Sequence, residues 1–231
     1  MCGIAGFISF DRDNGRPQWA AIAHSMGEAL NHRGPDDKGT WLCPAGALIH
    51  RRLAVIDPDR GRQPMTRTRD CAEYTIVYNG ELYNTDALRR ELSDQGYRFE
   101  TSSDTEVLLT AYMAWGEEVP ARLEGIYAFV IWDGVRNQFF ACRDRFGVKP
   151  FFYALADDGA LVFGSELKAL FQYPGLTPTL TKPLPAYRLI AASFEARTSR
   201  LRKESSSSRA RRIISSMSAE ATPRRRKNLR K

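Results

Sequence analysis

The sequence predicts an α+β fold in which antiparallel sheets are covered on the outside by helices. Strand-like runs follow one another directly along the chain, and helical segments stand in blocks between them, without the strict strand–helix alternation of parallel sheets. Of the 231 residues, 43% are hydrophobic and 11% aromatic, so the chain can bury a substantial core. The length allows one large or two small domains, and the sequence contains no internal repeat.

The predicted strands are short apolar or β-branched runs bounded by turn-forming residues. The chain opens MCGIAGF, and the glycines in residues 3–8 suit the close approach of a neighbouring backbone. Residues 74–78 form a second run, and the Asn79-Gly80 pair after them is a strong turn signal. The other predicted strands are residues 125–132 and 138–142, joined as a hairpin through Asp133-Gly134, and residues 161–163.

Three longer segments have the apolar period of a helix. In the segment 85–95, Leu88 and Leu92 lie one helical turn apart, and Gly96 ends the pattern. In the segment 104–115, either Ser103 or Asp104 can cap the first turn. The predicted helices are residues 17–30, 85–95 and 104–115, with one further helical turn at 166–171.

The charge of the chain is divided unevenly. Residues 181–231 contain 15 Lys and Arg against 3 Asp and Glu, a net charge of +12, so residues 1–180 hold 19 basic and 24 acidic residues, a net charge of −5. The basic segment is rich in serine and arginine, and Tyr187 and Phe194 are its only aromatic residues. This composition predicts a disordered tail, with a local helix allowed only around residues 186–196.

Several classes of protein are disfavoured by simple patterns. No apolar run approaches the roughly 20 residues of a membrane span, and we expect no secretory signal at the start of the chain. The cysteines show neither CxxC pairing nor the spacing of zinc ligands. A cytoplasmic protein with reduced thiols is therefore expected. The cysteines are Cys2, Cys43, Cys71 and Cys142.

Cys2 stands directly behind the initiator methionine, where a thiol can serve chemistry. Removal of Met1 would give Cys2 a free α-amino group, whose usual pKa of about 8 leaves a useful neutral fraction near pH 7. A nucleophile activated by its own terminal amine is an established solution in enzymes. The alternative is that Cys2 is a small apolar residue of the first strand, and by residue type alone this alternative is favoured.

The stretch Asn79-Gly80-Glu81 also has two interpretations. A hairpin turn is the commonest use of Asn-Gly. The functional interpretation is an oxyanion hole, because an asparagine amide and a glycine N–H can both donate to a developing negative oxygen.

Arg52 and Asp104 together could hold the two charged ends of an α-amino acid. An arginine beside a strand can bind a carboxylate with two hydrogen bonds, and an aspartate at a helix start can accept from an ammonium group. The alternatives are a surface arginine and an ordinary helix cap. The histidines have no metal-binding spacing, and we expect structural roles for His24, His32 and His50, as for Cys43, Cys71 and Cys142.

The order of these segments resembles a known family, the glutaminase domain of class II glutamine amidotransferases. Within it the chain is most similar to the asparagine synthetase branch, and the resemblance runs from Cys2 to about Gly175. Eight motifs in order carry it: MCGIAGF, NHRGPDDKGTW, HRRLAVID, GRQP, YNGELYN, SDTEVLL, RDRFGVKPFFY and FGSELKAL.

The resemblance implies a fold and a role for each matching residue. The implied fold is the four-layer αββα sandwich of N-terminal-nucleophile hydrolases, built of two antiparallel sheets. The implied reaction is hydrolysis of L-glutamine to glutamate and ammonia through a thioester, without a metal or cofactor in this chain. Cys2 would be the nucleophile, Asn79 and Gly80 the oxyanion hole, Arg52 the partner of the substrate carboxylate, Glu81 and Asp104 the partners of its amino group, and the backbone around Leu53, Ala54, Val55 and Ile56 the pocket wall.

The chain departs from the family pattern after its first 180 residues. Family members continue into a synthetase domain whose SGGxDS loop binds ATP, with magnesium, and no SGGxDS occurs here. We interpret residues 2–180 as the glutaminase domain and residues 181–231 as a basic tail from an out-of-frame end or a truncated product. A separate synthetase domain or a homodimer partner is then expected. The alternatives are an inactive truncated product and a protein whose basic tail binds nucleic acid. The composition disfavours nucleic-acid binding, because charge runs are usually only solvated.

Overall fold

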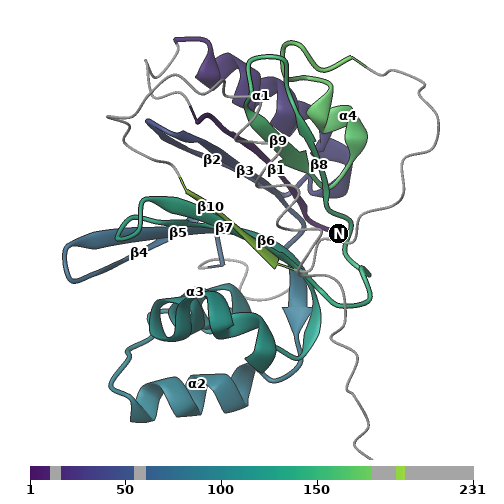
Figure 1. Ribbon diagram of the computed structural model, residues 1–231. Coiled ribbons are helices and arrows are strands. Elements are labelled where there is room, and N and C mark those ends of the chain that lie inside the picture. The colour runs from purple at the N-terminus through teal and green to yellow at the C-terminus, as the bar shows by residue number, and fades with distance from the viewer. Residues whose placement is uncertain (11–16, 55–60, 178–190, 196–231) are drawn as a thin grey trace, which may run out of the picture.

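Two five-stranded antiparallel sheets face each other in the computed structural model, and helices cover their outer faces (Figure 1). The structure describes residues 1–10, 17–54, 61–177 and 191–195. The first sheet has the order β2 (Asp37–Cys43), β3 (Gly46–Arg52), β1 (Gly3–Ile8), β9 (Leu161–Gly164) and β8 (Phe152–Leu155). The second has the order β10 (Ala191–Glu195), β7 (Gln138–Arg143), β6 (Gly125–Asp133), β5 (Ala72–Leu82) and β4 (Met65–Arg69).

Helices α1 (Trp19–Ala29) and α4 (Leu167–Leu170) lie on the first sheet, whereas α3 (Asp104–Trp115) lies on the second and α2 (Thr85–Asp94) packs beside α3 (Figure 1). Two short 3₁₀ helices, Asn31–Arg33 and Gly116–Arg122, follow α1 and α3. The predicted four-layer αββα sandwich is confirmed. Within the described residues, none of the helices has both the length and the apolar character needed to cross a membrane.

Three apolar layers hold the sandwich together. Alternate residues of β1 point to opposite faces of its sheet, so Ile4 contributes to the layer between the sheets and Phe7 to the layer under α1. In the same way β5 sends Val77 between the sheets and Ile76 toward α3. Strands buried on both faces read as continuous apolar runs, which is why β1, β6 and β9 were predictable from the sequence.

The turn predicted at Asn79-Gly80 is wrong. Strand β5 runs on to Leu82, and its pairing with β6 places Asn79 opposite Ala128 and Gly80 opposite Tyr127. Long pairing with β6 outweighs the local turn preference of the two residues. The glycine is needed because a Cβ at position 80 would lie 2.5 Å from the carbonyl oxygen of Ile126.

The predicted helices begin and end close to where the sequence places them. Helix α3 starts as expected, with Ser103 rather than Asp104 as its cap, since the Ser103 hydroxyl accepts from the Glu106 N–H at 3.3 Å. Leu88 and Leu92 of α2 are buried, and Gly96 after it adopts a φ of +87°. Strands β2, β3, β4 and β8 were not predicted. The first three mix charged and polar residues with apolar ones, and β8 is an apolar run of only four residues.

One segment of the basic tail is a strand. Residues 191–195 pair with β7 along the edge of the second sheet, in register from Ala191 opposite Cys142 to Glu195 opposite Gln138. The disorder predicted for the tail, and the local helix allowed around residues 186–196, are therefore wrong over 191–195. An unpaired sheet edge offers a row of N–H and C=O groups to any extended segment, and that pairing outweighs local helix preference. The rest of the predicted tail lies outside the described residues.

Candidate active site

A cavity of about 310 Å³ lies where the start of β1, the end of β3, the middle of β5 and the first turn of α3 meet. Residues from opposite ends of the sequence line it. They include Met1, Cys2, Arg52, Leu53, Gly61, Gln63, Tyr78, Asn79, Gly80, Glu81, Ser103, Asp104, Thr105 and Lys149. The structure thus brings together every residue that was predicted to act in catalysis or to bind the charged ends of the substrate. These residues are Cys2, Arg52, Asn79, Gly80, Glu81 and Asp104.

Cys2 precedes β1 and is fixed by backbone contacts. Its Sγ atom lies 3.4 Å from the Leu53 N–H, which donates to it, and 3.5 Å from the Leu53 carbonyl oxygen. The carbonyl of Cys2 accepts from Arg33 Nε at 3.0 Å. A chain end is normally loose, but here both the side chain and the backbone of Cys2 are held at the cavity.

Arg33 is itself anchored by a cluster of charged side chains. Its Nη1 donates to Glu166 at 2.9 Å, and His32 and Lys168 also contact the Glu166 carboxylate. Partial burial opposes ionisation of Glu166, but the hydrogen bonds from Arg33, His32 and Lys168 prevail and lower its pKa to about 2. The ion cluster therefore holds Arg33, and Arg33 holds Cys2.

Asn79 places an unsatisfied donor at the cavity. The residue is 2% exposed, and its Nδ2 has no hydrogen-bond partner. Buried polar groups are nearly always paired, so an unpaired amide at a cavity wall indicates a missing acceptor. Gly80, next along β5, presents backbone without a side chain to the same cavity.

Asp104 lies in the first turn of α3 and is buried. Its Oδ2 accepts from the Tyr78 hydroxyl at 2.9 Å and from the Leu82 N–H at 3.5 Å. Burial raises the pKa of Asp104, and the hydrogen bonds from Tyr78 and Leu82 counteract this rise. Glu81 lines the cavity from β5 but is exposed to solvent.

Arg52 ends β3 and is 5% exposed, so it is not the surface arginine that was the alternative. Leu53 beside it forms part of the wall. Ala54 is not among the lining residues, and its N–H donates to Asp36 at 2.8 Å. Val55 and Ile56 lie outside the described residues.

Several residues at the cavity were not among the individual candidates. Gln63 and Lys149 line it and belong to the motifs GRQP and RDRFGVKP. Arg33, which contacts Cys2 from outside the lining, belongs to NHRGPDDKGTW, so the motifs themselves were the signal. Tyr78 is likewise the first residue of the motif YNGELYN, although its residue type alone gives no sign of a role. The expected structural role of His50 agrees with its burial at 1% exposure.

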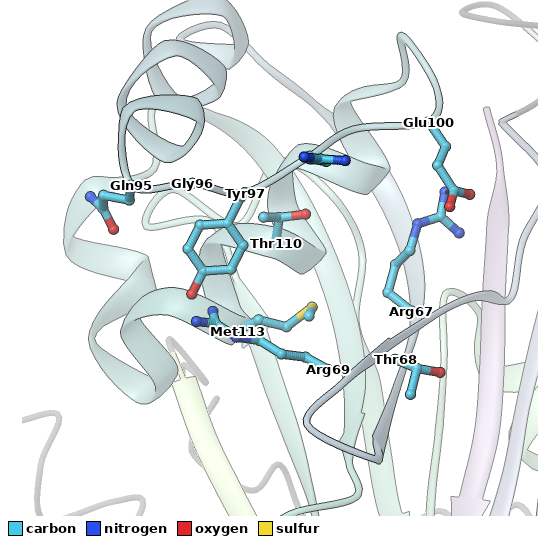
Figure 2. Close-up of a pocket in the computed structure, with 10 residues that line it drawn as sticks. Arg67, Thr68, Arg69, Gln95, Gly96, Tyr97, Glu100, Thr110 and Met113 are labelled. Carbon is cyan, nitrogen blue, oxygen red and sulfur yellow. Dashed lines mark ion pairs between the residues drawn. The ribbon is translucent and has the colours of Figure 1, made fainter.

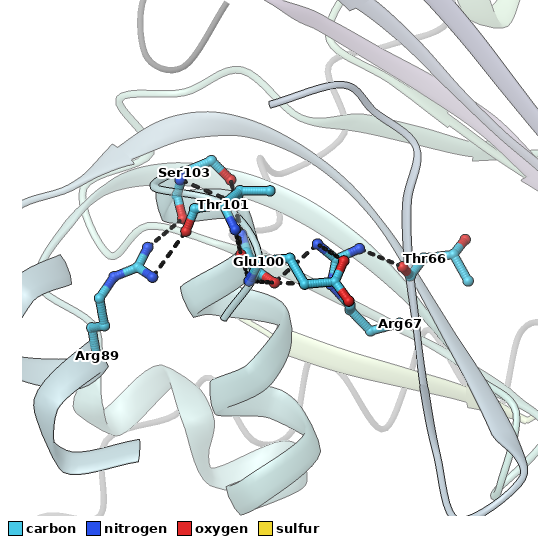
Figure 3. Close-up of polar contacts among 7 residues, drawn as sticks. Thr66, Arg67, Arg89, Glu100, Thr101 and Ser103 are labelled. Atoms are coloured by element: carbon cyan, nitrogen blue, oxygen red, sulfur yellow. Dashed lines mark hydrogen bonds and ion pairs between the residues drawn. The ribbon is translucent and has the colours of Figure 1, made fainter. Parts of the chain in front are cut away.

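A polar network supports the segment that leads into α3 (Figure 3). The buried Glu106 carboxylate accepts from Arg67 Nε at 2.9 Å and from the Thr101 N–H at 2.7 Å. Arg89 of α2 donates to the carbonyls of Thr101 and Ser103 at 3.0 and 3.3 Å. These contacts fix the turn that positions Asp104.

A second cavity, of about 300 Å³, lies between β4 and the segment joining α2 to α3 (Figure 2). Its lining is rich in arginine, but Arg67 is engaged by Glu106 and Arg69 stacks on Tyr97 at 4.3 Å. Of the predicted site residues, none lines it. The predicted site residues are therefore gathered at the first cavity and not at the second.

The other cysteines lie away from the first cavity. Cys142 is buried in β7, where burial raises the pKa of its thiol. Cys43 is half-buried and Cys71 is exposed, and neither lines the cavity. Within the part of the chain that the structure describes, no three His, Cys, Asp or Glu side chains gather as metal ligands would.

Comparisons with known proteins agree with this geometry. The family described as "Glutamine amidotransferase domain" matches residues 1–208. Asparagine synthetase [glutamine-hydrolyzing] 3 of Bacillus subtilis is 47% identical over 176 residues, 76% of this chain and 28% of the relative. Asparagine synthetase B [glutamine-hydrolyzing] of Escherichia coli is 34% identical over 170 residues, 74% of this chain and 30% of the relative. The chain thus spans less than a third of the length of these relatives.

A solved structure of glutamine phosphoribosylpyrophosphate amidotransferase from B. subtilis, complexed with ADP and GMP, has a TM-score of 0.62 and 25% identity. The match covers 74% of this chain and 43% of that one. Both sheets and the helices outside them agree with the N-terminal-nucleophile fold. With the family matching over most of its length, the chain belongs to the glutamine amidotransferase domain family and carries the glutaminase domain found in asparagine synthetases.

Proposed function

We propose that Cys2 of this chain hydrolyses L-glutamine to L-glutamate and ammonia through a thioester. The observation that carries the proposal is the unpaired Nδ2 of buried Asn79 at the same cavity as Cys2 and Asp104. A donor left without an acceptor in the resting site is what an oxyanion hole requires.

Substrate binding uses charges at the two sides of the cavity. Arg52 binds the α-carboxylate with two parallel hydrogen bonds. Asp104 and Glu81 accept from the α-ammonium group, and backbone near Leu53 forms the wall. Held at this end, the side-chain amide of glutamine reaches Cys2 Sγ, which the Leu53 N–H fixes in place at 3.4 Å.

The reaction then proceeds through two tetrahedral states. After Met1 is removed, the α-amino group of Cys2 takes the thiol proton as Sγ attacks the amide carbon. Asn79 Nδ2 and the Gly80 N–H donate to the oxyanion. The carbon–nitrogen bond breaks, the nitrogen takes the proton from the α-ammonium group, and ammonia leaves. Water adds to the thioester with the same amine as base, which releases glutamate and restores the thiol.

A Cys2→Ala substitution tests the nucleophile. Ammonia release from glutamine should disappear, while the melting temperature stays close to that of the parent, since Cys2 is half-buried at a chain end. A thiol-directed glutamine analogue should label Cys2, located by peptide mass spectrometry, only in protein that has lost Met1. Cys71→Ala is the matched control and should keep full activity. Ammonia release by the Cys2→Ala variant at the parent rate would exclude Cys2.

The use of the ammonia is proposed from the relatives. We propose that it is consumed by an asparagine synthetase domain, in a longer polypeptide or a separate subunit, that supplies the ATP and magnesium chemistry. The glutaminase reaction itself needs no cofactor, and we place it in the cytoplasm. Addition of a purified synthetase domain, aspartate and ATP to this chain should yield asparagine from glutamine. Failure to do so, with glutamine hydrolysis intact, would exclude that acceptor.

A further inference from the structure

Tyr78 and Asp104 form a buried pair beside the catalytic candidates. The Tyr78 side chain is 3% exposed, and its hydroxyl donates to Asp104 Oδ2 at 2.9 Å across a separation of 26 residues. Tyr78 directly precedes Asn79 on β5, so one strand carries the oxyanion donor and the residue that contacts Asp104. Both members of the pair line the cavity.

A second contact ties the same two elements together. Gln63 Oε1 accepts from the Tyr78 N–H at 2.6 Å, while Gln63 Nε2 donates to Thr105 Oγ1 at 3.2 Å. The first turn of α3 is therefore fixed to β5 by both the side chain and the backbone of Tyr78. A shift of Asp104 relative to Asn79 would break these contacts.

We propose that Tyr78 is a positioning residue for substrate selection, which holds Asp104 oriented toward the α-ammonium group of an L-amino acid substrate. The inference rests on the proposed binding of glutamine by Asp104. Tyr78 itself acts through the carboxylate, because its hydroxyl is already committed to Asp104. The structure thereby gains a means of rejecting γ-amides that lack an amino group.

The electrostatics of the cavity support this role. Burial is the main cause that raises the pKa of Tyr78 well above its usual value, and the negative charge of Asp104 adds to the rise. The phenol therefore stays a neutral donor. Burial raises the pKa of Asp104, and the Tyr78 hydrogen bond opposes that rise. The other charged or titratable groups at the cavity are Arg52 from β3, Glu81 from β5, Lys149 from the segment after β7, the Cys2 thiol and the N-terminal amino group.

Loss of the hydroxyl in Tyr78→Phe should weaken glutamine recognition. Hydrogen bonds to charged groups contribute enough that KM should rise by about 10- to 100-fold, with kcat changed by less than about 3-fold. Without the donor, the pKa of Asp104 rises, so the acid limb of kcat/KM should move to higher pH. Preference for glutamine over glutaramic acid, which lacks the α-amino group, should fall by the same factor as KM rises.

A matched control comes from a similar pair of residues in the apolar layer between the second sheet and α3, to which Tyr78 also belongs. The Tyr112 hydroxyl donates to Asp133 Oδ2 at 3.1 Å, both residues are 1% exposed, and neither lines the cavity. Tyr112→Phe should lower the melting temperature without altering KM, the acid limb or the preference for glutamine. A structural effect common to both pairs would change the two variants alike.

Two further measurements keep the test decisive. In an Asp104→Asn background, Tyr78→Phe should change KM by less than about 2-fold, because the partner through which it acts is gone. If Tyr78→Phe does not fold, 3-fluorotyrosine at position 78 keeps the ring and hydroxyl while making the phenol a stronger donor, and the acid limb should move to lower pH. An unmoved acid limb there would overturn the inference.

Direct binding separates this inference from the proposed reaction. Calorimetry of glutamine with Cys2→Ala protein, with and without Tyr78→Phe, measures Kd without turnover. A parent chain that releases no ammonia would overturn the proposed function, while the Kd comparison would still judge Tyr78. Equal Kd values for the two proteins, or an equal loss in KM for Tyr112→Phe, would overturn the role of Tyr78.

Discussion

An Asn79→Ala substitution removes a buried amide donor that has no hydrogen-bond partner, and it should separate activity from stability. Asn79 lies in the middle of β5, opposite Ala128 of β6, so the substitution leaves the strand pairing intact. Its Nδ2 is unpaired in the folded protein. In the proposed reaction it gains an acceptor only when the tetrahedral oxyanion forms.

The substitution should lower kcat but should not lower the stability of the fold. Loss of one oxyanion donor typically removes about 2.7–4 kcal/mol of transition-state stabilisation, so kcat should fall by about 10²–10³-fold with little change in KM. An unsatisfied buried donor costs a folded protein about 1–3 kcal/mol, and alanine relieves this cost. The relief offsets the packing lost with the side chain, so we expect a melting temperature equal to or above that of the parent.

Asn84 provides the control, because both ends of its amide are paired. Its Nδ2 donates to the Arg122 carbonyl at 2.8 Å, and its Oδ1 accepts from the Glu124 N–H at 3.1 Å. Asn84→Ala should therefore lose about 0.5–1.5 kcal/mol of unfolding free energy for each bond and keep its kcat.

Steady-state release of glutamate, measured over a range of glutamine concentrations, gives kcat and KM for the three proteins, and thermal unfolding gives their stabilities. An Asn79→Ala variant with kcat within about 3-fold of the parent would refute the oxyanion assignment. A rise in KM alone would instead make Asn79 a ground-state binding residue. Destabilisation as large as that of Asn84→Ala would refute the reasoning from the unpaired amide.

Two further predictions concern the arginine and the histidine of β3. Arg52→Lys keeps the charge but loses the two-pronged donor, so KM for glutamine should rise by about 10-fold with a smaller effect on kcat, whereas Arg122→Lys at the surface should change neither constant. Burial lowers the pKa of His50 from 6.5 to about 3, so the unfolded chain binds the extra proton between these values. The free energy of unfolding should be at its full value above about pH 6.5 and fall by at most about 1.4 kcal/mol per pH unit below it. Urea unfolding of His50→Gln should show a flatter slope from pH 4 to 7, and an unchanged slope would exclude His50 as its source.

The sequence by itself determined the elements whose patterns are local. Helix α3 was predictable because Val107, Leu108 and Ala111 share one face and a serine precedes them. Strand β1 was predictable because it is buried on both faces and so carries an uninterrupted apolar run. Cys2 was marked by its position behind Met1, and the ordered motifs identified the family.

Strand β3 shows where local patterns fail. It ends in His50, Arg51 and Arg52, all buried, although arginine and histidine are not typical of a buried strand. What makes these residues tolerable is distant in sequence: Arg51, for example, donates to the Gly27 carbonyl of α1 at 2.9 Å. A pattern read along the chain contains no trace of that partner.

Only the tertiary structure decided what Asn79 and Gly80 do. Locally they favour a turn, but β6 continues to pair with β5 beyond them, and the energy of that pairing is set by residues about 50 positions away. The same holds for the contacts of Tyr78 with Asp104 and of Arg33 with Cys2. Sequence patterns report the preferences of neighbouring residues, whereas the active-site geometry depends on which distant segments the sheets and helices bring together.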